Sequence, residues 1–369
     1  MEIIDAMEMH ELANLLSLIG PFPRTVELLL KSKQLITENQ KLLTLKSLYE
    51  GTKSLLTTKY EQQRKEMISG SVEDVLHILR YLLEGLHDLD DSVVEKAVIR
   101  GLVSVDTIGK LSIVFLYLHT ALSNFSQIDA TFLDRYVKYV FAEAANATTM
   151  EELIADFITF KHNIYYRLNI STVPADKFFH GARLNKEVSE IEIPIGTEME
   201  CVKSAHCTSE ILSDIYNMKA EGVSINLKKR STEVIVGSNW SGGDGIISFN
   251  PKHNTHASVF MVYEAKKQVS TSFEGLDTKD SFEHEQNEYQ QYLKKSKISD
   301  PCLFLYCNAG STNVGSNDMF KKVAGSNSML VDKSNWTSFF KIIPRQWVPC
   351  HLDNHQKLIP RVGNGSERE

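Results

Sequence analysis

The sequence predicts an α+β protein in two parts, a helical N-terminal region followed by a mixed α/β domain. Apolar residues recur at helical spacing through most of the chain up to Leu168. Beyond Ala142, short runs rich in Val and Ile, broken by Gly, Ser and Asn, predict strands instead. With 369 residues the chain is long enough for two or three domains.

The composition is that of an ordinary globular protein, with 42% hydrophobic and 24% charged residues, so most of the chain has enough apolar surface to fold. Its longest apolar stretch, residues 111–122, is shorter than the roughly 20 residues of a membrane span, and His119 interrupts it. We therefore expect no membrane. The first residues are acidic where a signal peptide needs a basic start. Five cysteines, an odd number, indicate a reducing, intracellular compartment.

The helical region is expected to contain several helices separated by strong breakers. A helix over residues 8–18 ends at Gly20-Pro21-Phe22-Pro23, and a short helix over residues 24–30 follows. Residues 42–67 predict an exposed helix or helical pair, and residues 72–85 are strongly amphipathic.

A second motif follows this amphipathic helix. Residues 91–100 predict another helix, closed by Gly101, and residues 102–106 and 110–116 predict two short strands. Helix, turn, helix and small hairpin is typical of a winged-helix module. The second helix carries Asp90, Asp91 and Glu95 against only Lys96 and Arg100. We therefore favour a packing or protein-contact module, with DNA reading as the alternative.

The α/β part starts with an amphipathic helix over residues 150–168. Strands are expected over residues 192–195, 233–236, 245–249, 258–263, 302–306 and 328–331. A polar helix over residues 281–295 separates the fourth of these strands from the fifth.

Four residues around the third and fourth strands point to phosphodiester chemistry. Asp244 opens one strand, and the next ends in Glu264-Ala265-Lys266, with Gln268 beyond. Alternation puts Glu264, Lys266 and Gln268 on one face, and a hairpin would bring Asp244 close to Glu264.

Two carboxylates at a strand end form a hard-oxygen site of the kind that Mg²⁺ prefers. A nearby lysine can orient a metal-bound water and offset the charge that grows on a phosphate in the transition state. Glu264-Ala265-Lys266 is the only Glu-x-Lys in the chain. The structural alternative is a solvated strand end whose charges keep the sheet edge soluble.

This arrangement resembles the P-D-(D/E)-x-K nucleases of the restriction-endonuclease-like superfamily. The resemblance implies an αβββαβ core in which Asp244 and Glu264 hold the metal, Lys266 acts on the water and Gln268 is an auxiliary residue. Gly243 stands where the motif has its Pro.

The same resemblance implies a further metal-binding and catalytic carboxylate in the first helix of the core, which would be Glu151. Glu152 is its rival. A structural role is the other interpretation, because Thr148-x-x-Glu151 also fits a capping box.

The wider layout resembles the C-terminal part of Crinkler-type and retrotransposon hot-spot proteins, which join an ATPase, a winged-helix-like segment and such a nuclease domain. Gly20-Pro-Phe-Pro-Arg24 is similar to the lid turn of these ATPases, and Phe178-Phe-His-Gly-Ala182 and Met329-Leu-Val-Asp332 are similar to segments of the nuclease domain. No Gly-x4-Gly-Lys-[Ser/Thr] is present, so ATP binding is not expected.

These observations predict four segments. Residues 1–70 would be a helical remnant of an ATPase lid, 71–142 a winged-helix-like domain, 143–355 the nuclease domain and 356–369 a flexible tail. The expected function is Mg²⁺- or Mn²⁺-dependent cleavage of DNA with low sequence specificity, in an effector that acts inside cells, in the nucleus, with host proteins as further partners. The alternative is an inactive nuclease fold that binds DNA or protein. The net charge of −7 excludes neither, since Lys228-Lys-Arg230 can form a local basic rim.

Overall fold

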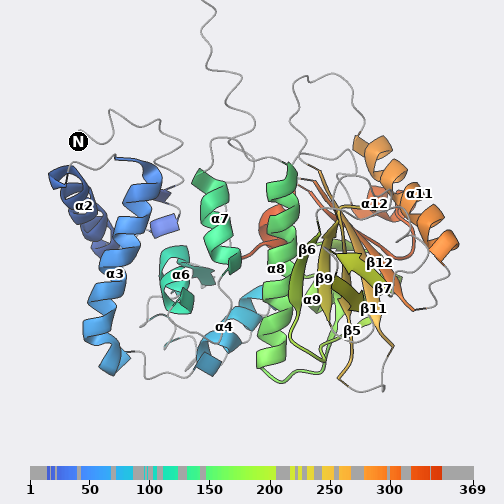
Figure 1. The fold of residues 1–369 in the computed structure, drawn as a ribbon, viewed down its shortest axis with the longest axis horizontal. Helices are drawn as coiled ribbons and strands as arrows, with labels where there is room; N and C mark the ends of the chain where they lie inside the picture. Colours follow the sequence, from blue (N-terminus) through green and yellow to red (C-terminus); the bar gives the residue numbers. More distant parts are fainter. Residues whose placement is uncertain are drawn as a thin grey trace, which may run out of the picture.

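The computed structural model confirms the predicted mixture of helices and strands, with helices at one end and a sheet at the other (Figure 1). None of the helices in its described parts is long and apolar enough to cross a membrane. The structure describes residues 15–16, 18–20, 23–39, 43–67, 72–85, 95, 98, 103–105, 111–123, 131–141, 147–204, 217–220, 223–226, 231–236, 243–252, 257–266, 278–296, 300–308, 317–332 and 334–342. The predicted tail and the last part of the proposed nuclease domain lie outside these ranges.

Helices dominate the first part of the chain, as the sequence predicts. The first long one runs well beyond the expected end at residue 30, because apolar residues continue at helical spacing to Ile36. It packs against the second, and both lie at the far end of the molecule from the sheet (Figure 1). The helices of this region are α2 (Pro23–Glu38), α3 (Leu45–Met67), α4 (Val72–Glu84), α6 (Phe115–Ser123) and α7 (Thr131–Phe141).

The small hairpin of the second motif is present, but its second strand is shorter than expected. Strands β1 (Val103–Val105) and β2 (Leu111–Ile113) pair antiparallel. The prediction of a strand through residue 116 is wrong, because α6 begins at Phe115. This short apolar run fits a strand or a buried helix equally well. Almost all of α6 is buried, which indicates that packing from several sides stabilises the helix over a strand. Most of the expected second helix, over residues 91–100, lies outside the described residues.

A seven-stranded mixed sheet forms the centre of the second part. Its middle consists of an antiparallel meander, β9–β10–β11, followed by the parallel strands β12 and β13. The sheet order is β4 (Arg183–Leu184), β13 (Ser328–Val331), β12 (Cys302–Asn308), β11 (Val259–Lys266), β10 (Gly245–Phe249), β9 (Thr232–Val236) and β6 (Glu200–Ser204). Two further pairs stand apart: β3 (Thr172–Pro174) with β5 (Glu192–Pro194), and β7 (Asn217–Ala220) with β8 (Val223–Asn226).

Helices cover both faces of this sheet. The long helix α8 (Ala147–Arg167) packs on the face that bears Met261 and Tyr263. On the other face lie α11 (Thr278–Ser296) and α12 (Asn317–Val323), which connect the parallel strands. The ring of Tyr289 in α11 stacks on Phe304 at 4.8 Å between centroids. Three short helices complete the fold: α9 (Ala175–Phe178), α10 (Lys186–Ser189) and α13 (Trp336–Phe339).

A buried lysine joins the helical region to the sheet region. Lys161 of α8 is fully buried, and its ammonium donates a hydrogen bond to the carbonyl of Leu83 in the last turn of α4, at 3.3 Å. The rings of Phe157 and Phe178 lie within 6 Å of it. Burial is the largest cause that lowers the pKa of Lys161 to about 7, while the nearby Glu84 carboxylate opposes this shift. A cation at a helix C-terminus also complements the helix dipole.

Candidate functional site

The pairing of β10 with β11 brings Asp244 to the end of β11. The paired register ends with Gly245 opposite Tyr263, and Asp244 directly precedes Gly245. The backbone N–H of Asp244 donates to the carbonyl of Tyr263 at 2.8 Å, one residue out of this register, so Asp244 and Gly245 both lie against Tyr263, as in a β-bulge. Asp244 Oδ2 accepts a hydrogen bond from the backbone N–H of Ala265 at 2.6 Å. Asp244 therefore lies beside the backbone of residues 263–265, and a metal site shared by its carboxylate and that of Glu264 stays a prediction.

Glycines around Asp244 allow this close approach of the two strands. A Cβ at Gly245 would lie 2.3 Å from the Tyr263 ring, and one at Gly243 would lie 2.7 Å from Val262 Cγ1. Gly243 also has φ +142°, which L side chains rarely adopt. Close packing against β11 thus explains the glycines on both sides of Asp244. The Pro of the motif could not stand at position 243 unless the backbone changed, because proline fixes φ at about −65°.

Glu264 lies on the face of the sheet away from α8. Its neighbours Tyr263 and Ala265 belong to the core beneath α8, so the alternation of the strand puts Glu264 on the α11 side. Only 5% of Glu264 is exposed, while Asp244 is half-buried. Two acids that lie close together destabilise a sheet pair unless a cation or a proton offsets their charge.

The two carboxylates fit a divalent cation by their chemistry. Carboxylate oxygens are the ligands that Mg²⁺ prefers, and Mg²⁺ commonly takes only one or two of them and keeps several waters. The residues that could hold it are Asp244 and Glu264. Within the described ranges, no group of three or more His, Cys, Asp and Glu residues is arranged to hold a metal ion.

The other predicted site residues are not brought into this pair by the described structure. Lys266 is the last residue of β11, opposite Asn308 of β12, and its side chain lies outside the described atoms. Gln268 lies beyond the described residues. Glu151 is half-buried on α8, the helix that covers the opposite face of the sheet from Glu264. Its role in metal binding stays a prediction.

The two alternatives to a catalytic Glu151 can be compared with the structure. Thr148 lies within α8 rather than before it, which is not the position of an N-cap, so the capping box does not describe this helix. Glu152 pairs with Arg135 of α7 at 3.4 Å between Oε2 and Nη1. Glu152 thereby fastens α8 to α7, which favours a structural role for it.

Two polar residues at the same edge were missed from the sequence. Asn308 ends β12 and is 1% exposed, and Asp332 directly follows β13 and is also 1% exposed. Because β11, β12 and β13 are parallel, their carboxyl ends meet at one edge of the sheet, beside Glu264. A polar residue at the end of an apolar run is the signal that could have found both: Asn308 ends β12, and Asp332 follows Val331.

Asp332 has a structural explanation. Arg183 Nη1 donates to Asp332 Oδ2 at 3.1 Å, and the backbone N–H of Ser334 donates to Asp332 Oδ1 at 2.9 Å. These bonds tie the edge strand β4 to the end of β13, so we assign Asp332 no part in the chemistry.

Comparisons with known proteins add no relative: the chain matches no protein-family model, no curated protein and no solved structure. The functional argument therefore rests on the chemistry and placement of its own residues.

Proposed function

We propose that the chain is a metal-dependent DNA endonuclease with a restriction-endonuclease-like domain that starts at α8. The observation that supports this function is the placement of Asp244 against the backbone of Tyr263 and Ala265, on either side of Glu264 at the end of β11. The elements α8, β9, β10, β11, α11 and β12 also occur in the αβββαβ order that the sequence resemblance implies, with eight further described elements, from β3 to β8, between α8 and β9. The winged-helix-like region and the Crinkler-like setting, with action in the nucleus and host proteins as partners, belong to the same proposal.

In this proposal Asp244 and Glu264 hold Mg²⁺ or Mn²⁺. When bound, the ion lowers the pKa of a bound water and polarises the phosphoryl oxygen. Lys266, two residues beyond Glu264 on β11, orients the attacking water and offsets the negative charge that develops on the phosphate. Gln268 helps to orient the same water, and Glu151 supplies a further carboxylate.

The reaction is a hydrolysis. The water oxygen forms a new bond to phosphorus, and the bond from phosphorus to the leaving sugar oxygen breaks. The proton of the attacking water passes to solvent, and the leaving oxygen takes up a proton. Low sequence specificity is expected because contacts to the phosphodiester backbone carry no sequence information.

A second candidate function is that of an inactive nuclease fold that binds DNA or protein. The burial of Glu264, only 5% of which is exposed, favours it, because a metal must reach that carboxylate. The hydrogen bond from the Ala265 N–H to Asp244 also gives this carboxylate a structural use.

Plasmid nicking with Mg²⁺, Mn²⁺ or EDTA separates the two candidates. The nuclease proposal expects metal-dependent cleavage by the wild type and a loss of at least about 10³-fold in Glu264→Gln, since the metal and its ligands act on the transition state. The matched control is Glu192→Gln, which changes an exposed glutamate in β5 and should cleave like the wild type. Metal-dependent cleavage that survives in pure Glu264→Gln, or no cleavage by folded wild type, overturns the nuclease proposal.

A further inference from the structure

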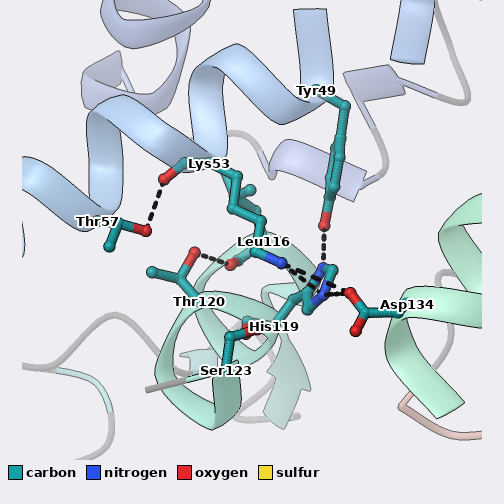
Figure 2. A network of polar contacts seen from close by, with 8 residues as sticks. All are labelled: Tyr49, Lys53, Thr57, Leu116, His119, Thr120, Ser123 and Asp134. Atoms are coloured by element: carbon teal, nitrogen blue, oxygen red, sulfur yellow. Dashed lines mark hydrogen bonds and ion pairs between the residues drawn. The ribbon is translucent and has the colours of Figure 1, made fainter. Parts of the chain in front are cut away.

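Four side chains from three helices meet at a buried imidazole far from the sheet edge (Figure 2). His119 lies in α6 with 1% of its side chain exposed. Its Nδ1 is 2.8 Å from the Tyr49 hydroxyl of α3. Its Nε2 is 2.7 Å from Lys53 Nζ, one turn further along α3, and 2.8 Å from Asp134 Oδ1 of α7. We name this set of Tyr49, Lys53, His119 and Asp134 the imidazole latch.

The contacts at Nε2 constrain where the protons lie. A lysine ammonium can only donate and an ionised aspartate can only accept, whereas a ring nitrogen holds either a proton or a lone pair. In one neutral form, Nε2–H donates to Asp134 and the Tyr49 hydroxyl donates to Nδ1. In the other, Lys53 donates to Nε2 and Nδ1–H donates to the Tyr49 oxygen. Both neutral forms use both ring nitrogens, but Nε2 bonds only one of its two neighbours in each. The first form sets Nε2–H against the Lys53 ammonium at 2.7 Å, and the second sets the Nε2 lone pair against Asp134 Oδ1 at 2.8 Å. Lys53 pairs with Asp134 at 3.7 Å in either case.

A protonated imidazole does not fit this arrangement. Both ring nitrogens then donate, so Nε2–H still bonds to Asp134, but the Lys53 ammonium faces a second cation at 2.7 Å. Burial is the largest cause that lowers the pKa of His119, and Lys53 adds to it, while Asp134 and Glu50 oppose the shift. Burial lowers the pKa of Lys53 as well. Tyr136 of α7 is the other titratable group that acts on this cluster, through Tyr49.

We propose that the imidazole latch is an acid-operated switch, in which a proton on His119 expels Lys53 and releases α3, together with α2, from α6 and α7. Two observations indicate that α3 and α2 would move together. Lys53 and Tyr49 are the α3 residues bonded to the latch, and α2 packs on α3 (Figure 1).

The direction of the pH effect follows from linkage. In the released form His119 titrates near the ordinary value of about 6.5, and in the closed form its pKa is lower. The closed form therefore binds fewer protons, so its stability is kept above about pH 6.5 and is lost as the pH falls towards the closed-form pKa. Between pH 7.5 and pH 5.5 the opening equilibrium of α3 should rise, by up to about ten-fold.

Hydrogen exchange of the full chain at pH 7.5 and pH 5.5, corrected for the intrinsic exchange rate, tests this switch. We expect the protection of α3 amides to fall at pH 5.5, by up to about ten-fold. No change in the protection of α3 would overturn the proposal.

Two variants and a control decide whether His119 is responsible. His119→Gln cannot take up the proton, so it should lose the acid response of α3. Lys53→Met removes the cation that faces the protonated ring, so its acid response should be smaller than that of the wild type, and this variant keeps the test decisive if His119→Gln does not fold. The control is His162→Gln, which removes another fully buried histidine, in α8, and whose α3 amides should respond like those of the wild type. An acid response in Lys53→Met as large as that of the wild type contradicts the proposal.

Discussion

The helical region and the sheet edge treat charged side chains in opposite ways. Two arginines of the described helices lie against opposite charges: Arg80 lies 2.6 Å from Glu84, and Arg135 lies 2.7 Å from Asp156. Where β10 begins beside the end of β11, one acid, Asp244, instead lies against the backbone on either side of another, Glu264. Opposite charges fasten two elements together, whereas like charges that are close together cost folding free energy.

This difference indicates where function lies in the molecule. The ion pairs of the helices have a structural role, because each one holds together the segments that it joins. Two acids that lie near each other at a strand end are the kind of arrangement that functional sites retain, because it becomes favourable once a cation is bound. Three substitutions can break or sharpen this comparison.

The largest effect is expected where a buried pair of opposite charges is broken. Asp332→Ala leaves Arg183 without its carboxylate, and 2% and 9% of their side chains are exposed. Removal of one partner of such a pair should lower the free energy of unfolding by about 4 kcal/mol. Urea denaturation measures it. The control is Glu190→Ala, which removes an exposed partner of Lys186 and should change stability by less than about 0.5 kcal/mol. Equal effects of the two variants would refute the structural role of Asp332.

A smaller effect is expected at the imidazole latch. Tyr49→Phe removes the hydroxyl that faces His119 Nδ1 and leaves this buried nitrogen without that partner. The free energy of unfolding should fall by about 1 kcal/mol at pH 7.5, by the same measurement. Tyr81→Phe, at a half-buried tyrosine of α4, should cost less. A Tyr49 variant as stable as the wild type would show that the hydrogen bond contributes nothing.

The smallest effect on stability is expected at Glu264. Glu264→Gln keeps the shape of the side chain and removes one of the two like charges, so without metal the unfolding free energy should stay within about 0.5 kcal/mol of the wild type or rise. Thermal denaturation in EDTA checks this. A loss of more than about 2 kcal/mol would show that Glu264 is there for the fold.

Local sequence patterns were enough to predict most of the sheet. The strands β9, β10, β12 and β13 lie where the Val- and Ile-rich runs indicated, because such runs between turn residues have few other solutions. The antiparallel pairing of β10 with β11 could be predicted for the same reason, since a short connection makes an antiparallel neighbour.

The rest depends on contacts between segments far apart in the chain. Tyr49 and His119 are 70 residues apart, and the sequence around His119 does not predict which side chains bond to it. Phe115 starts a helix where the local apolar run also allowed a strand, and only the packing around α6 decides. The edge strand β4 is two residues long, too short to leave a pattern.

Metal binding tests the central claim most directly, because it needs no assumption about the substrate. Isothermal titration of the full chain with Mn²⁺, after removal of metals, should show one site in the wild type and in Glu192→Gln. The same titration of the double variant Asp244→Asn, Glu264→Gln should show at least about a hundred-fold weaker binding. Equal binding by the double variant and the wild type, or no binding by folded wild type, would contradict the assignment of this sheet edge as a metal site.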